Sequence, residues 1–389
     1  MDFDFKEEQL QLADAVRRWI ARDYGFEARR AILASAAGSS DAAWATMAEL
    51  GLTALPVPEA HGGFDGNALD LFLVMQELGR GLVVEPYFAT VLGARLLALG
   101  GGEGGGALLE RVAAGELKLA CALGERQSRH DMRDIATRAA PDGAGGWVLS
   151  GEKKVVLNGA QAGVLLVSAR TRGAQRDEDG IVLFALPADA PGATLSDYRM
   201  LDGRRGADLR LDAVRVGPEA LVGPAHGGWE ILDAALDYGA GLLCAEALGA
   251  MEALFSATLD YLKTRQQFGV PIGKFQALQH RMADMAVHLE QARSMALLAA
   301  VRLSDPGIDA TARRSAVSAA KYRVGQAARF VGQQAVQLHG GIGVTDELPA
   351  AHWFKRLATI ELALGDCDHH LARFIAQPGF AQPDAREAA

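Results

Sequence analysis

Residues 261–285 read YLKTRQQFGVPIGKFQALQHRMADM, and this stretch decides the fold of the C-terminal half of the chain. Gly269, Pro271 and Gly273 break the helical pattern within five positions. Apolar residues then recur every three or four positions, as on a helix buried along one side. These residues are Phe275, Leu278, Met282, Met285 and Leu289. The spacing therefore predicts one helix that ends before a turn, and a second helix that starts after it.

Arg265 and Phe268 fall at this transition between helices. A guanidinium group can pair with a phosphate through two hydrogen bonds, and an aromatic ring beside it can pack on a nucleotide. For Arg265 alone, the alternative is a solvated arginine that the dipole favours at a helix C-terminus. A second segment, QLHGGIG at residues 337–343, follows later in the chain, and its alternative is a helix end with a capping glycine.

Taken together, the two segments resemble the signature of the acyl-CoA dehydrogenase family. That signature is Tyr-x-x-x-Arg-x-x-Phe-Gly with Phe-Gln-x-x-Gln, followed by Gln-x-x-Gly-Gly-x-Gly. The resemblance extends from Phe5 to Leu371. Three shorter segments are similar to the small subunit of the family's pimeloyl-CoA dehydrogenase branch: Tyr24–Glu27, Glu125–Arg129 and Asp366–His370.

The resemblance implies an α+β fold with an N-terminal helical domain, a middle β-barrel or sandwich domain and a C-terminal helical bundle. Periodicity points independently to the same order. Helical spacing dominates up to about residue 114 and returns from Trp229. Between about 116 and 223 lie short β-type runs, at Trp147–Leu149, Lys154–Leu157, Val164–Ser168, Ile181–Ala185 and Leu209–Val216. We place the domains at 1–115, 116–224 and 225–376, with a loose tail at 377–389. The glycine-rich run at 100–106 follows a helical pattern, so we expect an interhelical loop rather than a phosphate-binding loop.

Composition narrows the class of protein. With 389 residues, the chain can bury a sizeable core. The formal net charge is −9 with no basic cluster, which argues against nucleic acid as a partner. No run of about twenty uncharged apolar residues stands out, so we expect no membrane span. The N-terminus does not resemble a signal peptide, and three widely spaced cysteines suit a reduced cytoplasmic protein without a metal site.

Members of the family oxidise an acyl-CoA thioester at Cα–Cβ, as in fatty acid β-oxidation. A glutamate takes the α-proton while the β-hydrogen leaves as hydride to FAD. In the family each FAD lies across a subunit interface, and the neighbouring subunit supplies the Arg, Phe and Gln-x-x-Gly-Gly residues. The resemblance assigns this role here to Arg265, Gln267, Phe268, Gln276, Gln337, Leu338, His339, Gly340 and Gly341.

The half of the FAD site beside the flavin ring is altered. The family's Trp-x-Thr-Asn falls on Val155-Val156-Leu157-Asn158, so an apolar side chain replaces the hydroxyl that would bond the flavin. The family's Thr-Glu-Pro-x-x-Gly-Ser-Asp falls on residues 124–131, GERQSRHD, and little of it is kept. The chain therefore retains the contacts that a neighbour donates and lacks those that hold the ring.

The catalytic glutamate is missing from both of its known family locations, where Gly365 and Gly239 stand. Three carboxylates are possible substitutes. Asp366 is the first, although an N-cap is the preferred interpretation. Glu361 is alternatively a surface residue, and Glu246 a buried structural carboxylate. We interpret His369 and His370 as a paired surface face rather than a metal site.

The resemblance thus implies the small, base-lacking subunit of a heterotetramer that completes the FAD site of a paralogous large subunit. An electron-transfer flavoprotein would accept the electrons. One alternative is a self-sufficient homo-oligomer with a substitute carboxylate. The other is a module that binds acyl-CoA or stabilises a partner without redox chemistry.

Overall fold

A computed structural model describes residues 5–378 of the chain. The described chain divides into two compact units. The first contains the chain up to Leu71 and Val83–Gly239, and the second contains Phe72–Leu82 and the chain from Ala240. Helices α4 and α7 each contribute residues to both units.

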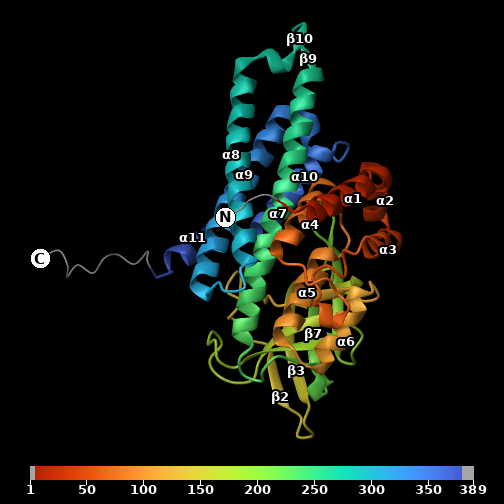
Figure 1. Cartoon of the computed structure of the whole chain (residues 1–389), viewed down its shortest axis with the longest axis vertical. Coiled ribbons are helices and arrows are strands. Elements are labelled where there is room, and N and C mark those ends of the chain that lie inside the picture. The colour runs from red at the N-terminus through yellow and green to blue at the C-terminus, as the bar shows by residue number, and fades with distance from the viewer. Residues whose placement is uncertain (1–4, 379–389) are drawn as a thin grey trace, which may run out of the picture. The chain divides into compact units, whose positions relative to one another are not determined.

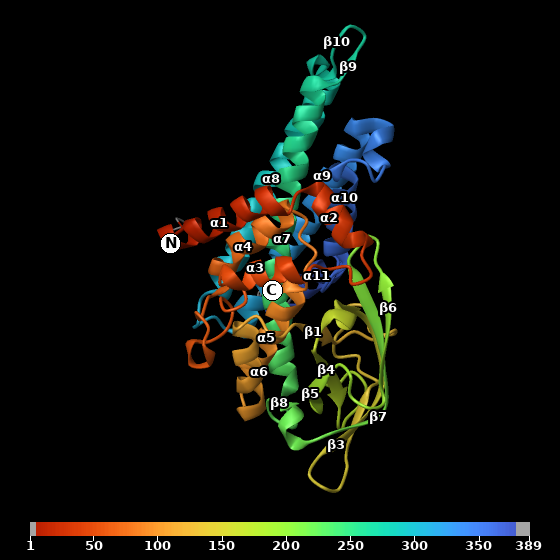
Figure 2. The ribbon, with the colours of Figure 1, turned by 90° about the vertical axis from the view of Figure 1, so that its right-hand side faces the viewer.

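The first unit begins with helices, as the periodicity predicts. The buried side chains Ala13, Val16 and Trp19 of α1 follow the 3.6-residue repeat. Helices α5 and α6 contact each other, and α5 also contacts the sheet (Figure 2). The helical elements are α1 Glu7–Asp23, α2 Phe26–Ala34, α3 Asp41–Glu49, η1 Glu59–His61, α4 Ala68–Arg80, α5 Tyr87–Gly100 and α6 Glu103–Ala113.

The glycine-rich run is helical over most of its length, so the expected loop is largely wrong. Helix α5 ends at Gly100 and α6 starts at Glu103. Close packing explains glycine within α6. A Cβ added to Gly104 would lie 2.5 Å from the carbonyl oxygen of Glu219, and one added to Gly106 would lie 2.7 Å from His61. Packing here outweighs the low helix propensity of glycine.

The rest of the first unit is a sheet of eight strands, with path β6-β7-β3-β2-β4-β5-β8 and β1 paired to β4. All neighbours are antiparallel except β1–β4 and β2–β4. The predicted β-type runs all lie in strands, and their buried side chains, such as Leu165, Val167 and Phe184, form the core. The elements are β1 Leu119–Ala122, β2 Arg138–Pro141, β3 Trp147–Leu157, η2 Gly159–Gln161, β4 Val164–Arg170, β5 Ile181–Pro187, β6 Ala193–Arg199, β7 Arg205–Val216, η3 Pro218–Ala220 and β8 Leu221–Val222.

Helix α7, Gly228–Thr264, bears on the expectation that no segment of the chain spans a membrane. Over the described residues, it is the one helix whose length and composition would suffice to cross a membrane. However, 72% of its most apolar window is buried inside the protein, as in a core helix. It also carries buried carboxylates, including Glu246 and Glu252. These features argue for a helix buried by protein rather than by lipid.

The second unit is a helical bundle that ends in a small hairpin. Helices α8 and α9 pack together, and α10 and α11 pack on α9. The hairpin β9–β10 joins α7 to α8 at their ends (Figure 1). The elements after α7 are β9 Gln266–Gln267, β10 Val270–Pro271, η4 Ile272–Lys274, α8 Gln276–Leu303, α9 Ala310–His339, η5 Gly340–Val344, α10 Pro349–Leu362 and α11 Cys367–Ile375.

Candidate functional site

The hairpin between α7 and α8 has a strained, exposed aromatic residue at its tip. The pairs Gln267–Val270 and Gln266–Pro271 leave Phe268 and Gly269 as a two-residue turn. Their φ angles are 55° and 79°, the sign that a type I′ hairpin turn requires. A phenylalanine with positive φ is uncommon, and such strain concentrates at functional sites. Phe268 is 90% exposed, and its ring contacts that of Phe275 edge to face with centroids 6.0 Å apart, so the turn presents a large apolar surface outside the protein core.

The predicted polar contacts on this end of the bundle are also exposed. Arg265 and Gln267 flank the turn, and Gln276 begins α8. Among residues 5–378, no side chain pairs with the guanidinium of Arg265. An arginine without an intramolecular partner is free to meet a phosphate from another molecule.

The second motif lies against the first. The rings of Tyr261 and His339 stack with centroids 4.6 Å apart, and the Tyr261 hydroxyl donates to the His339 carbonyl oxygen at 3.3 Å. Gln337, Gly340 and Gly341 are exposed beside this contact. The structure thus joins the two motifs, which lie about 70 residues apart in sequence, at one end of the bundle.

The glycines of the second motif face open space. A Cβ added at Gly340 or Gly341 would meet no atom within 4 Å, and Gly340 has φ 66°. The residues before them are different: the side chains of Leu338 and His339 are buried. Of the second motif, Gln337 and the two glycines are therefore the residues that a bound molecule could approach closely, whereas the side chains of Leu338 and His339 are not accessible. With the guanidinium of Arg265, these exposed groups fit the pyrophosphate and adenine side of FAD.

The segment where the family holds the flavin ring keeps an unusual backbone but not the side chains. β3 contains an irregularity between Lys153 and Val156, and Val155 there has φ 54° with a side chain that is 54% exposed. A β-branched residue in this conformation is a genuine outlier. Asn158 also has positive φ and donates through Nδ2 to Gln161. Leu157 offers no hydrogen-bonding group, so the side-chain set does not fit the ring.

The preceding segment is held by a buried ion pair. Nζ of Lys153 lies 2.7 Å from a carboxylate oxygen of Glu125, which also accepts from the backbone N–H groups of Ala136 and Thr137. Burial alone would raise the pKa of Glu125, but the Lys153 ammonium and hydrogen bonds from Gln127 and Thr137 lower it to about 2. Arg129 stands where the family motif has glycine and still has φ 47°. Glu125 therefore acts as a structural clamp on this segment.

The family's principal base position is closed in this chain. Gly365 has φ 109°, and a Cβ added to it would lie 2.6 Å from Cδ2 of His369 and 2.6 Å from Nε2 of His370. His370 is buried, which contradicts the predicted surface face, and burial near Lys321 lowers its pKa to about 2. Gly239, at the other family position, is buried within α7. Neither location offers a carboxylate.

Each substitute carboxylate has a structural partner. Asp366 caps α11 by accepting from the His369 N–H at 2.8 Å, which confirms the N-cap interpretation. Glu246 receives two hydrogen bonds, at 2.8 and 2.7 Å, from the guanidinium of Arg356.

The third substitute, Glu361, accepts from Arg329 at 2.9 Å and from the backbone N–H of Cys367 at 3.2 Å. With these hydrogen bonds, all three carboxylates have structural roles.

Within residues 5–378, no cluster of three or more His, Cys, Asp or Glu side chains could hold a metal.

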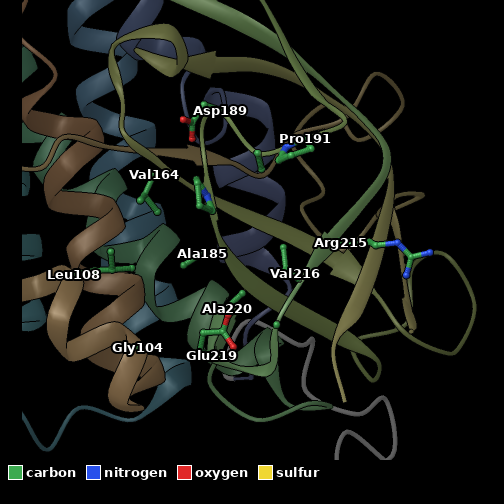
Figure 3. A pocket seen from close by; sticks show the side chains of 13 residues that line it. Gly104, Leu108, Val164, Ala185, Asp189, Pro191, Arg215, Val216, Glu219 and Ala220 are labelled. Carbon is green, nitrogen blue, oxygen red and sulfur yellow. The ribbon is translucent and has the colours of Figure 1, made fainter. Parts of the chain in front are cut away.

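A separate cavity in the first unit does not involve the predicted residues. It has a volume of about 550 Å³ and lies between α6, the ends of β4, β5 and β7, and η3 (Figure 3). Its walls are mainly apolar, with Leu108, Val164 and Val216 among them, and Asp189 and Glu219 lie at opposite ends. The residues of the two motifs and of the base positions lie elsewhere in the chain.

Comparisons with known proteins match most of the chain. The N-terminal, middle and C-terminal domain models of acyl-CoA dehydrogenases match residues 6–116, 120–214 and 226–377. The probable acyl-CoA dehydrogenase YngJ of Bacillus subtilis is 33% identical over 327 residues, which cover 82% of this chain and 84% of that protein. The human mitochondrial short-chain specific acyl-CoA dehydrogenase is 31% identical over 330 residues, covering 82% and 78%.

Two of the similar solved structures are two-component assemblies by name. A variant of the Tcur3481–Tcur3483 steroid ACAD has a TM-score of 0.85 and 31% identity, covering 95% of this chain and 96% of that chain. The ChsE4–ChsE5 complex from Mycobacterium tuberculosis has a TM-score of 0.84 and 26% identity, covering 96% and 97%. The chain therefore belongs to the acyl-CoA dehydrogenase family of FAD-dependent oxidoreductases.

Proposed function

We propose that this chain is the base-lacking small subunit of a heteromeric acyl-CoA dehydrogenase and completes the FAD site of a paralogous catalytic subunit. One observation carries the proposal. The contacts that the family donates across an interface are kept and exposed, whereas both base positions are glycine. Arg265, Phe268 and Gln337 represent the retained set, and Gly365 and Gly239 the lost one.

The division of labour follows from the geometry of the exchange. If each subunit donates to its neighbour's FAD, a base-lacking subunit still supports one working site per heterodimer, and two heterodimers would form a heterotetramer. When bound at that site, FAD accepts the hydride from the substrate. In this chain, Arg265 binds the pyrophosphate and Phe268 packs beside it. The two-component names of the similar ACAD structures support this arrangement.

The same observations weigh against the self-sufficient alternative. Glu246, Glu361 and Asp366 all accept hydrogen bonds that stabilise the second unit, so none is free to take a proton from a substrate. Leu157 removes a contact to the flavin ring. A non-redox binding module would not need the donated set, which is kept.

The remaining partners follow from the family. The substrate is an acyl-CoA thioester, and a dicarboxylyl-CoA is the proposed class on the strength of the three short segments that resemble the pimeloyl-CoA dehydrogenase branch. An electron-transfer flavoprotein is the proposed electron acceptor. The three free thiols suit the reducing cytoplasm as its location.

Native co-purification tests the proposal. The tagged chain should carry a second acyl-CoA dehydrogenase chain in equal amount, and only the complex should reduce a dye with acyl-CoA. Pimeloyl-CoA and a monocarboxylic acyl-CoA of the same length would test the substrate class. Recovery of this chain as an active homo-oligomer would refute the proposal.

A further inference from the structure

The turn that carries the base in the family has a demanding backbone here although its base is gone. Leu364 and Gly365 join α10 to α11, and their φ angles are 54° and 109°. Two successive residues with positive φ cost conformational energy, since one of them is a leucine. Such a turn persists only where the surrounding structure fixes it.

A buried ammonium group fixes the turn from one side. Nζ of Lys321 on α9 donates to the carbonyl oxygens of Ile360, Glu361 and Gly365 at 2.9, 3.0 and 2.8 Å. The first two carbonyls belong to the last turn of α10, where few backbone donors remain, and Ile360 also accepts from the N–H of Ala363 at 3.2 Å. Lys321 therefore ties the end of α10 to the position of the lost base.

A buried imidazole fixes the turn from the other side. Nε2 of His370 lies 3.0 Å from the Leu364 carbonyl oxygen, and Nδ1 lies 3.4 Å from Oγ of Ser318. A carbonyl oxygen only accepts, so Nε2 carries the proton and Nδ1 accepts from the serine hydroxyl. The side chain of His370 is 2% exposed, so it has little room to move. The Nε2 proton of His370 is therefore used in the hydrogen bond that holds the turn at Leu364.

The same rings occupy the space that a base would need. A Cβ added to Gly365 would lie 2.6 Å from Cδ2 of His369 and 2.6 Å from Nε2 of His370, which is closer than real Cβ atoms approach other atoms. The two rings contact each other edge to face, with centroids 5.1 Å apart. Replacing glycine by glutamate would therefore require both the backbone and at least one buried ring to move.

We propose that His369 and His370 form a plug that closes the base position and keeps acyl-CoA out of this chain's own half of the complex. This inference rests on the proposed function and specifies how the second, base-lacking site of the complex is closed. The substrate is then left to the partner's site, where a base is present. If the base were simply missing, a larger residue at position 365 would be tolerated. The plug instead predicts that any residue larger than glycine at this position destabilises the folded chain.

A stability comparison on the full chain tests the plug without reference to flavin. Gly365→Ala should raise the equilibrium constant for urea unfolding at least about tenfold, because of the φ angle and the two ring contacts. Gly62→Ala is the matched control. Gly62 has φ 78°, but an added Cβ there would meet nothing within 4 Å. The control therefore measures the cost of positive φ alone, and its effect should be clearly smaller.

A second variant isolates the ring contact. In a His369→Ala background, Gly365→Ala should raise the equilibrium constant for urea unfolding by a factor at least about three times smaller than in the wild-type chain. The reason is that one of the two close contacts is already removed. Equal effects of Gly365→Ala in both backgrounds, or equal effects of Gly365→Ala and Gly62→Ala, would overturn the plug. These outcomes do not depend on whether the chain has a catalytic partner.

Ligand counting in the purified complex tests the consequence. Octyl-CoA, a thioether that resists oxidation, should bind at one equivalent per heterodimer. Two equivalents per heterodimer would show that the plug does not exclude the ligand. Dye reduction by the chain alone that disappears in His369→Ala would make this ring a base instead of a plug, and would refute the proposed function as well.

Discussion

Among the three substitute carboxylates, Glu246 is the one for which a catalytic role and a structural role predict the most different results on substitution. It lies on α7, where its two oxygens meet the guanidinium of Arg356 at 2.8 and 2.7 Å. The two residues are 1% and 3% exposed. Glu246→Gln keeps the shape of the side chain but leaves the arginine as a buried charge without its counterion.

The size of the effect follows from that burial. Removing one partner of a buried ion pair typically costs about 3–5 kcal/mol, because the remaining charge cannot return to water. A domain is stabilised by only about 5–15 kcal/mol in total, so the variant should lose a large fraction of its stability. A matched exposed pair provides the control. Asp179→Asn, which weakens the contact between Asp179 and Arg172, should have a much smaller effect, because both side chains are exposed and the solvent screens their charges.

Urea unfolding of the full chain, followed by circular dichroism, measures both variants. Replacing both partners, as in Glu246→Leu with Arg356→Leu, should recover much of the loss because no unpaired charge remains. Activity of the complex should fall only in proportion to the folded fraction. A Glu246→Gln chain that is as stable as wild type but abolishes activity would show that Glu246 is the base, and the structural assignment would be wrong.

Three further predictions address the donated contacts, the base position and acid stability. Arg265→Ala should weaken FAD binding in the complex by about 1.5–3 kcal/mol, and Gln337→Ala by less; wild-type flavin retention on dilution by both variants would contradict the donated contacts. Gly365→Glu should remain inactive alone and leave partner-dependent activity per folded subunit unchanged, because a base also needs a correctly held flavin; acyl-CoA oxidation by the isolated variant would show that its ring site works. The pKa of Glu125 is lowered to about 2 in the folded chain, so its contribution of about 3 kcal/mol should be present above pH 4.5 and be lost as the pH falls towards 2. Urea midpoints measured between pH 5 and 2.5 should fall less steeply for Glu125→Gln than for wild type.

The sequence predicts elements well where one pattern dominates. The break at residues 269–273 places the end of α7 and the start of α8, because three helix-breaking residues follow one another. The β-type runs in β4 and β5 are found because nearly every side chain in them is buried. The predicted runs leave out β1, β2, β6 and β8. For β6 the reason is the opposite one. Its side chains are partly or fully exposed, so its composition differs little from that of a loop.

Long-range partners escape sequence reasoning. Asp366 is recognisable as an N-cap from its place before α11, since capping is local. Glu246 and Arg356 are 110 positions apart, and no local pattern pairs them. The sequence places His370 with His369 on a paired surface face, but the fold turns it towards Ser318 and Leu364. The available signal is its position three residues after Cys367, which places the two on one face of α11.

The FAD content of this chain, produced alone and then together with its partner, tests the central claim most directly. The ratio of flavin absorbance to protein, with reduction by acyl-CoA followed in the same cuvette, gives both occupancy and competence. We predict a nearly colourless, inactive chain alone and about one reducible FAD per heterodimer in the complex. Stoichiometric FAD on the isolated chain that bleaches with acyl-CoA would contradict the account.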